Sequence, residues 1–215
     1  LQTIIHDIVD YHLPRFGCFH NCAFIRIRKA YPLHARRVMH AVWGAGQMSW
    51  TKMIVIVDDD VDVHDEQAVL ETLMHRCHRR RDVELVNGPL DILDHASPRL
   101  GAGHKIGFDA TAAWPGEEVR GVPHDAPAAG PPLDPDARRA LCATLDEEPA
   151  IEAAVMPDFG RGSCLLLAVR KTAPGDGIRA IERAWARIEP PHANFVIAVD
   201  AEYGLGDVEK ALFLL

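Results

Sequence analysis

The pentapeptide Met53–Val57 (MIVIV) restricts the fold more than any other stretch of this sequence. It is a continuous apolar run that ends abruptly at three carboxylates, Asp58 to Asp60. Unbroken apolar runs are typical of parallel strands that are covered on both faces. A central strand of a layered α/β fold is therefore predicted at this position.

The segments around this run alternate between two kinds of periodicity. Residues 22–29 alternate apolar and basic side chains, which predicts a half-exposed strand. Apolar residues recur at helical spacing from His34 to Trp43 and again from Glu66, which predicts two helices. The order strand, helix, strand, helix indicates an α/β protein with a Rossmann-like, mainly parallel sheet and right-handed crossovers.

The chain also contains an internal repeat. Residues 22–73 align without a gap on residues 164–215, with eleven identities where chance gives about three. This similarity indicates a duplicated strand–helix–strand–helix unit. A stretch rich in Pro, Gly and Ala at 121–135 is typical of a connector. We therefore expect an α/β domain at 1–120 and a second α/β half at 136–215, which can pack into the same sheet.

The carboxylates after the apolar run have three possible roles. They can bind a divalent cation, accept a phosphoryl group as in a receiver domain, or support a loop and a helix start. The repeat favours the third role, because Asp58 and Asp65 recur as Asp200 and Asp207, whereas Asp59 becomes alanine. An Asp that follows a strand can accept hydrogen bonds from loop amides, and one that precedes a helix can cap it. No metal ligand is assigned.

Two short segments carry soft metal ligands. They are CFHNC, with Cys18, His20 and Cys22, and HRCH, with His75, Cys77 and His78. Together they contain enough Cys and His side chains for a zinc site. The spacing is not the usual C-x-x-C, however, and a strand entry followed by a basic helix end explains both segments. The second interpretation is favoured.

Residues 101–117 form the most unusual stretch, with four glycines, Lys105, Asp109 and a WPGE turn. Glycines beside a lysine can bind a phosphate through backbone N–H groups. The stretch lacks the G-K-[ST] and the following helix of a phosphate loop. We predict an ordered loop that packs against another surface, with Trp114 as a buried anchor. Lys105 and Asp109 are the candidates for contact with a cofactor, although structural roles are favoured for both.

The composition limits the partners and the location. A net charge of −8 argues against a nucleic-acid partner, which needs a basic face to neutralise phosphates. No run of eighteen apolar residues is present, so no membrane span is predicted. Five scattered cysteines are typical of reduced thiols in the cytoplasm. The abrupt start at Leu1 and the apolar end at 212–215 suggest a fragment of a longer polypeptide.

Four motifs occur in order at 29–39, 51–63, 80–98 and 103–117. They are K-x-Y-P-x-H-A-R-R-V-M, TK-x-IVIVDDDVDV, RRDVELVNGPLDILDHASP and GHKIGFDAT-x-x-WPGE. Together they resemble the C-terminal domain of the UbiD family over about residues 5–118. The FHN near the start and the HA-x-W-G-x-G-Q-M segment are most similar to the menaquinone-pathway decarboxylases. From Gly121 on, the resemblance fades.

The resemblance implies a carboxy-lyase for unsaturated or aromatic acids that uses prenylated FMN. In that family the flavin, a divalent metal, potassium and the acidic proton donor lie largely on preceding domains. The C-terminal domain joins protomers and closes over the flavin pocket. No stretch of this sequence matches the catalytic motifs, so no catalytic residue is assigned and no cofactor is expected on this fragment.

We therefore expect the C-terminal assembly domain of a decarboxylase for 3-polyprenyl-4-hydroxybenzoate or a related aromatic acid in quinone biosynthesis. Its partners would be its own N-terminal catalytic domains and further copies in a homo-oligomer. The fragment alone is expected to be inactive. The alternative is a stand-alone α/β binding or oligomerisation module without catalysis.

Overall fold

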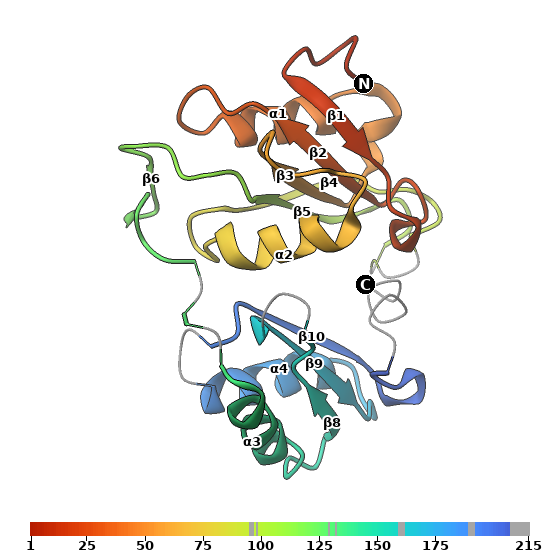
Figure 1. Cartoon of the computed structure of the whole chain (residues 1–215). Coiled ribbons are helices and arrows are strands. Elements are labelled where there is room, and N and C mark those ends of the chain that lie inside the picture. Colours follow the sequence, from red (N-terminus) through yellow and green to blue (C-terminus); the bar gives the residue numbers. More distant parts are fainter. Residues whose placement is uncertain are drawn as a thin grey trace. The chain divides into compact units, whose positions relative to one another are not determined.

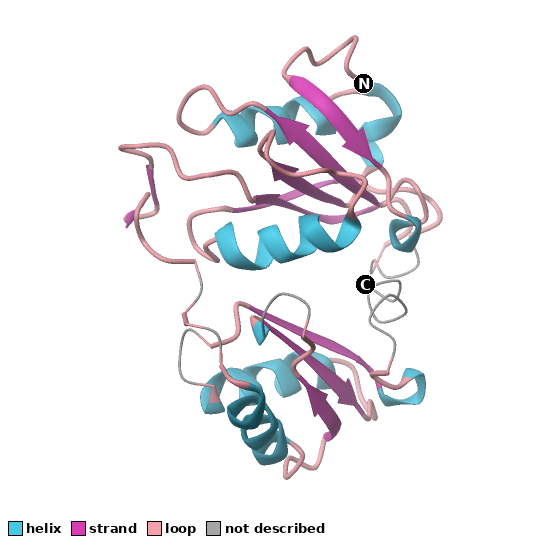
Figure 2. Cartoon of the chain, viewed as in Figure 1, coloured by secondary structure: helices cyan, strands magenta, loops and turns pink. Residues whose placement is uncertain are grey.

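The computed structural model divides the chain into two compact units, Leu1–Ala128 and Ala129–Leu215 (Figure 1). It describes residues 1–94, 97, 99–128, 130–131, 133–158, 162–188 and 192–206. The division falls inside the predicted connector, just after a two-stranded ribbon of β6 (Glu118–Val119) and β7 (Val122–Pro123). Each unit combines helices with a sheet, so the protein is a mixed α/β protein (Figure 2).

The first unit is built on a five-stranded sheet of order β1-β2-β3-β5-β4. Its strands are β1 (Ile8–His12), β2 (Cys22–Ile27), β3 (Met53–Val57), β4 (Val83–Pro89) and β5 (Ala102–Asp109). The three central strands β2, β3 and β5 are parallel, whereas the outer strands β1 and β4 run antiparallel to their neighbours. The expected mainly parallel sheet is therefore limited to the centre, and the sheet as a whole is mixed.

The two predicted helices of this unit are confirmed as α1 (His34–Trp43) and α2 (Glu66–Arg76). Short 3-10 turns occur at η1 (Arg15–Gly17) and η2 (Gly46–Trp50). Helix α1 connects the parallel strands β2 and β3, as a crossover must. Helix α2 leads instead into β4, which is antiparallel to β5, so the second expected crossover is wrong.

Burial explains why the apolar run forms the centre of the sheet. Residues 54–57 of β3 are fully buried, and Ile54 and Ile56 pack with α1 in one apolar cluster. Strand β2 is also buried except at Arg26, because it lies between β1 and β3. The prediction of a half-exposed strand at 22–29 is therefore wrong, since its basic side chains lie at the end of the strand rather than along it.

The glycine-rich stretch is largely a strand rather than a loop, because residues 102–109 form β5 between β3 and β4. Its glycines make room for neighbouring side chains. A Cβ at Gly103 would lie 2.8 Å from Leu90 Cδ1, and one at Gly107 would lie 2.6 Å from Met39 Sδ. The glycines therefore serve close packing against α1 and the β4–β5 connection, within a strand rather than within the predicted ordered loop.

Replacing Gly107 by valine is expected to lower the free energy of unfolding by roughly 1–3 kcal/mol, because the new side chain overpacks the contact with Met39 and Trp43. The matched control is Ala102→Val, since Ala102 lies at the exposed start of the same strand. Urea unfolding of both variants measures the difference. Equal stability of the two variants would contradict the proposed packing role.

The second unit contains a three-stranded sheet of order β10-β9-β8, separate from the first sheet. Its elements are α3 (Pro135–Leu145), β8 (Ile151–Val155), β9 (Cys164–Val169), α4 (Asp176–Arg187), β10 (Phe195–Asp200) and the 3-10 turn η4 (Ala201–Tyr203). Both helices pack against the sheet through one apolar cluster that includes Leu145, Leu167 and Ala184. The two halves therefore do not share a sheet among the described strands.

The second sheet has the same strand pattern as one side of the first. Strands β2 and β3 pair in parallel from Cys22 and Met53, and β9 and β10 pair in parallel from Cys164 and Phe195. The preceding strands β1 and β8 are both antiparallel, and each carries one irregularity near its start. The part of the predicted repeat beyond residue 206 lies outside the described residues.

None of the helices within the described parts of the chain is long and apolar enough to cross a membrane.

Candidate functional site

The polar side chains of the first unit gather where its three parallel strands end. Lys29 follows β2, Asp58 follows β3, and Asp109 is the last residue of β5. Because parallel strands place their carboxyl ends at one edge, these residues lie at the same edge of the sheet. In open α/β sheets this edge is the usual place for functional groups.

A buried ion cluster occupies this edge. The Lys29 ammonium lies 2.7 Å from Glu117 Oε2 and 3.7 Å from Asp109 Oδ2. All three side chains are at most 7% exposed. One cation therefore balances two carboxylates away from water, and removal of that cation leaves two buried carboxylates without compensation.

Glu117 connects this cluster to two loops. Its carboxylate accepts hydrogen bonds from the amides of Leu33 (2.8 Å) and Trp114 (3.1 Å). Burial alone would raise the pKa of Glu117, but the hydrogen bonds from Lys29 and from the two amides outweigh it and hold the pKa below its ordinary value. Leu33 has a left-handed backbone with φ of 62° directly before α1. Glu117 therefore fixes an unfavourable backbone conformation at the start of that helix.

Asp109 is the group in this cluster whose protonation is most perturbed. Burial raises its pKa to about 6, although Lys29 and hydrogen bonds from Thr111 act in the opposite direction. The Thr111 amide donates to Asp109 Oδ1 at 3.0 Å, and the Thr111 hydroxyl donates to the same oxygen at 2.5 Å. The structure thus holds a carboxyl group that changes charge near neutral pH.

The acidic cluster after β3 supports the loops and the following helix, as the repeat suggested. Asp58 accepts from the amides of Lys29 (3.3 Å) and Ala112 (2.6 Å), and Asp65 caps α2 through the Ala68 amide (3.0 Å). The other carboxylates pair nearby: Asp59 with Arg28, Asp60 with Arg76, and Asp62 with the His64 amide. The predicted structural roles of Asp58 and Asp65 are confirmed.

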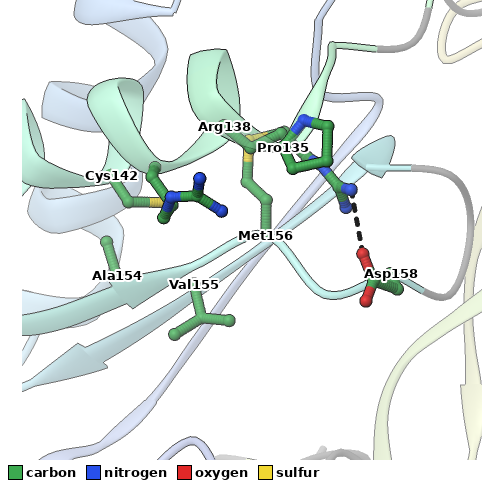
Figure 3. A pocket seen from close by; sticks show the side chains of 8 residues that line it. Pro135, Arg138, Cys142, Ala154, Val155, Met156 and Asp158 are labelled. Carbon is green, nitrogen blue, oxygen red and sulfur yellow. Dashed lines mark ion pairs between the residues drawn. The ribbon is translucent and has the colours of Figure 1, made fainter.

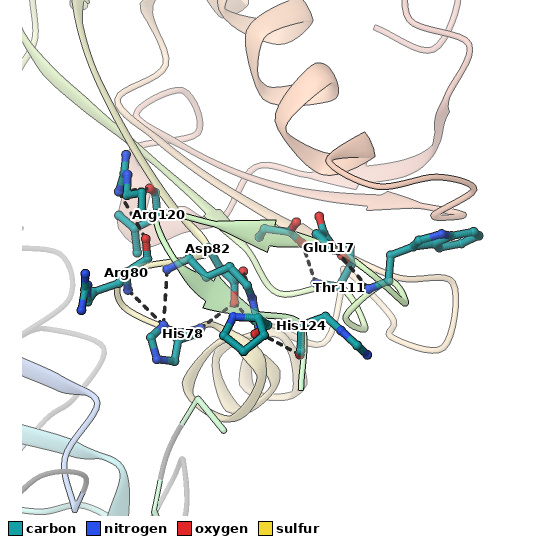
Figure 4. Close-up of polar contacts among 12 residues, drawn as sticks. His78, Arg80, Asp82, Thr111, Glu117, Arg120 and His124 are labelled. Atoms are coloured by element: carbon teal, nitrogen blue, oxygen red, sulfur yellow. Dashed lines mark hydrogen bonds and ion pairs between the residues drawn. The ribbon is translucent and has the colours of Figure 1, made fainter. Parts of the chain in front are cut away.

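A second buried pair lies beside the cluster. Arg81 binds Asp82 through two contacts of 2.7 and 2.8 Å, and its remaining nitrogen donates to the carbonyl oxygens of Pro123 and His124 at 2.8 Å each. The Asp82 carbonyl accepts from the Asp109 amide. Figure 4 shows these contacts around Asp82 and His124. The segment after the WPGE turn is therefore tied to the same edge of the sheet.

The two groups of soft ligands are not brought together. Cys22 begins β2, next to Glu66 at the start of α2, whereas Cys77 follows the other end of that eleven-residue helix. Burial raises the pKa of both thiols, which disfavours the thiolate form that metals bind. No group of three or more His, Cys, Asp or Glu side chains within the described ranges is arranged to hold a metal ion.

The two cofactor candidates both lie in β5, Lys105 in the middle of the strand and Asp109 as its last residue. Lys105 is 2% exposed, and its ammonium donates to the Ser49 carbonyl in η2. Burial lowers the pKa of Lys105. Asp109 belongs to the ion cluster at the carboxyl end of the strand. Both side chains are engaged inside the unit, which favours structural roles, and contact with a cofactor stays a prediction for both.

Sequence reasoning did not single out the pair at the centre of the site. Lys29 and Glu117 were part of the motifs, but they lie 88 residues apart and nothing in their local patterns links them. Trp114, predicted as a buried anchor, is only half-buried, and its amide rather than its ring makes the contact with Glu117. The available signal was the position of Lys29 as the last residue of the strand predicted at 22–29.

This chain is similar to parts of several solved structures. The vanillic acid decarboxylase of Sedimentibacter hydroxybenzoicus in open form is 22% identical, with a TM-score of 0.51, over 62% of this chain and 27% of that chain. The UbiD-class enzyme HmfF from Pelotomaculum thermopropionicum in complex with FMN is 29% identical over 51% and 24%, with a TM-score of 0.47. The 3,4-dihydroxybenzoic acid decarboxylase from Enterobacter cloacae is 22% identical over 53% and 25%, with a TM-score of 0.46. This chain therefore spans about a quarter of the length of these structures.

The family described as the 3-octaprenyl-4-hydroxybenzoate carboxy-lyase C-terminal domain matches residues 1–110. The matched region contains the whole five-stranded sheet and both helices of the first unit. It also contains Lys29 and Asp109 of the ion cluster, whereas Glu117 lies just beyond it. With more than half of its 215 residues matched, the chain belongs to the UbiD family through the C-terminal domain of that family.

Proposed function

We propose that residues 1–128 are the assembly and pocket-closing domain of a UbiD-class decarboxylase whose flavin is held by other domains. The observation that carries this proposal is the buried Lys29–Glu117–Asp109 cluster, which joins the loop after β2 to the segment after β5 at one edge of the sheet. A fixed edge provides a preorganised surface for a neighbouring domain or subunit. Such a role requires ordered loops rather than reactive side chains.

The proposed substrate is an aromatic acid, with 3-polyprenyl-4-hydroxybenzoate or a related compound of quinone biosynthesis as the first candidate. The description of the matching family supports this choice, and the HA-x-W-G-x-G-Q-M segment supports the menaquinone branch. When bound to the complete enzyme, prenylated FMN would supply the electron sink for loss of CO₂. It would be held with a divalent metal and potassium by the N-terminal catalytic domains. The scattered positions of the five cysteines support a cytoplasmic location.

The proposed partners are the N-terminal catalytic domains and further copies of the protein. Exposed apolar side chains on β4 and on its connection to β5 support such contacts. They are Leu85, Ile92, Leu93 and Leu100, which are 59–77% exposed. Apolar side chains grouped in this way often mark protein–protein contacts. We also propose that the α/β fold of residues 1–128 is Rossmann-like.

We also propose that the second unit arose by duplication of the β1-β2-α1-β3 part of the first. The equal registers of β2–β3 and β9–β10, and the matching irregularities in β1 and β8, support this origin. In the second unit Lys171 lies 2.6 Å from Asp200, and both side chains are partly exposed. The equivalent of Lys29 is thus retained without its buried cluster, which favours an interaction role for this unit.

The chain 1–215 is expected to show no decarboxylation of 3,4-dihydroxybenzoate or vanillate with added prenylated FMN, because the reacting groups would lie on other domains. The longer protein that contains this segment should release CO₂ and carry flavin after purification. Mass spectrometry of released flavin and detection of CO₂ measure both. Turnover by the isolated chain would contradict the proposed division of labour. If the longer protein carries no flavin and shows no turnover but binds another protein, the stand-alone interaction module would be favoured.

A further inference from the structure

The second unit contains a pocket of about 190 Å³ between α3 and β8 (Figure 3). One wall is apolar and consists of Cys142, Ala154, Val155 and Met156. The lining also includes Pro135, Arg138 and Arg139 from α3 and Asp158 from the segment after β8. The pocket lies outside the region that the family matches, and no part of the function proposed above uses it.

Arg138 is held in a fixed position at this pocket. A Cβ at Gly162 would lie 2.7 Å from Arg138 Cδ, so the stem of the arginine packs directly on that glycine. One terminal nitrogen donates to the Pro157 carbonyl at 3.3 Å, and the other lies 2.8 Å from Asp158 Oδ1. The Nε atom is buried and has no hydrogen-bond partner among the described residues. A buried donor without an acceptor is unfavourable and is satisfied by a ligand that supplies one.

The size and the chemistry of the walls restrict that ligand. A cavity of roughly 150 Å³ is large enough to bind benzene, so this pocket accommodates one ring together with a small polar group. The terminal nitrogens of the Arg138 guanidinium match a carboxylate, which accepts charge-assisted hydrogen bonds. Burial raises the pKa of the Cys142 thiol, so the sulfur beside the ligand is neutral and does not repel an anion.

We propose that this pocket binds a small monocarboxylic acid with a single ring, which places its carboxylate on Arg138 and its ring against Met156. Asp158 is the group that the ligand carboxylate displaces. Its side chain is 96% exposed, so it can turn into water at little energetic loss. This site is independent of the decarboxylase proposed above, because it involves only residues of the second unit.

The five methionines of the chain provide a direct test. Only Met156 lies in the second unit, whereas the other four lie within residues 1–128. The chain 1–215, labelled with ¹³C in the methionine methyl groups, is titrated with benzoate, and Met156→Leu assigns the resonance. We expect a saturable shift of the Met156 signal only, because the aromatic ring lies beside that methyl group. Acetate and benzyl alcohol, which each lack one half of the recognised group, are expected to bind at least tenfold more weakly.

Three variants separate the proposed contacts. Arg138→Met is expected to weaken benzoate binding by about tenfold or more, since it removes the charge-assisted contact. Val155→Trp keeps Arg138 but fills the pocket, and it is expected to abolish the shift. Arg183→Met is the matched control, because it also removes one arginine from a helix of this unit but lies outside the pocket.

A benzoate shift that fails to saturate, or that moves methionines of the first unit equally, would overturn the proposal. So would unchanged affinity in both Arg138→Met and Val155→Trp. Should Arg138→Met fail to fold, Val155→Trp alone decides, since its substituted side chain is 38% exposed in the native chain and tolerates replacement. Loss of binding in Arg183→Met as well would indicate non-specific attraction to positive charge and would equally refute the site.

Discussion

Replacing Lys29 by methionine is expected to lower the free energy of unfolding of the first unit by roughly 3–5 kcal/mol. The substitution leaves Glu117 and Asp109 buried without the ammonium that lies 2.7 and 3.7 Å from them. Two carboxylates in a low-dielectric site must then protonate, repel each other or draw water into the fold. The loops that Glu117 holds at Leu33 and Trp114 would loosen with them.

The measurement uses urea unfolding followed by tryptophan fluorescence in a Trp185→Phe background. The remaining tryptophans, Trp43, Trp50 and Trp114, then all report on the first unit. Arg28→Met is the matched control, since Arg28 is the preceding residue and its side chain is 78% exposed where it pairs with Asp59. An exposed pair of this kind contributes about 1 kcal/mol or less. Similar losses in the two variants would contradict the buried cluster as the source of stability.

The double variant with Lys29→Met and Glu117→Gln gives a second check on the same point. Removing the Glu117 charge together with its partner is expected to recover part of the stability lost in Lys29→Met, because fewer buried charges remain unpaired. Glutamine keeps an oxygen that can accept from the Leu33 and Trp114 amides. Purely additive losses would show that Lys29 and Glu117 do not act as a pair.

Replacing Asp109 by asparagine is expected to stabilise the first unit relative to the native chain, and increasingly so as the pH rises from 4 to 7. Burial raises the pKa of Asp109 from 3.8 to about 6 in the folded chain. Below pH 4 the Asp109 carboxyl is protonated in both the folded and the unfolded states, so its burial does not lower the free energy of unfolding by favouring ionisation of the unfolded chain. Between the two values only the unfolded state ionises, which favours unfolding.

Above pH 6 this penalty is complete and amounts to about 3 kcal/mol. Asparagine does not ionise, so the difference in unfolding free energy between Asp109→Asn and the native chain should grow by that amount across this pH range. Urea unfolding at several pH values, in the same tryptophan background, measures it. A flat difference would show that Asp109 ionises in the fold without a penalty.

Asp65→Asn serves as the reference for that experiment. Asp65 caps α2 through the Ala68 amide and is exposed to water, and asparagine is an equally good capping residue. Its substitution is therefore expected to leave the pH dependence of stability nearly unchanged. A pH effect equal to that of Asp109→Asn would indicate a general response of the charged surface rather than a buried carboxyl group.

The sequence alone determined the elements whose signal is local. The unbroken MIVIV run identified the central strand β3, the 3.6-residue spacing identified α1 and α2, and the position of Asp65 identified the cap of α2. The motifs at 29–39 and 103–117 identified the family, because several specific residue types recur there in a fixed order. Each of these signals depends on side chains that are close together along the chain.

The tertiary structure alone decided which distant residues meet. Glycines at 103 and 107 suggested a loop, but both lie in strand β5. Glycine is needed there because a side chain would fill the space that Leu90 and α1 occupy. Antiparallel edges could not be derived from the strand–helix alternation, since the direction of β1 and β4 depends on pairing across the sheet. The ion cluster forms because parallel strands bring their carboxyl ends to one edge, which joins Lys29 to a glutamate 88 residues away.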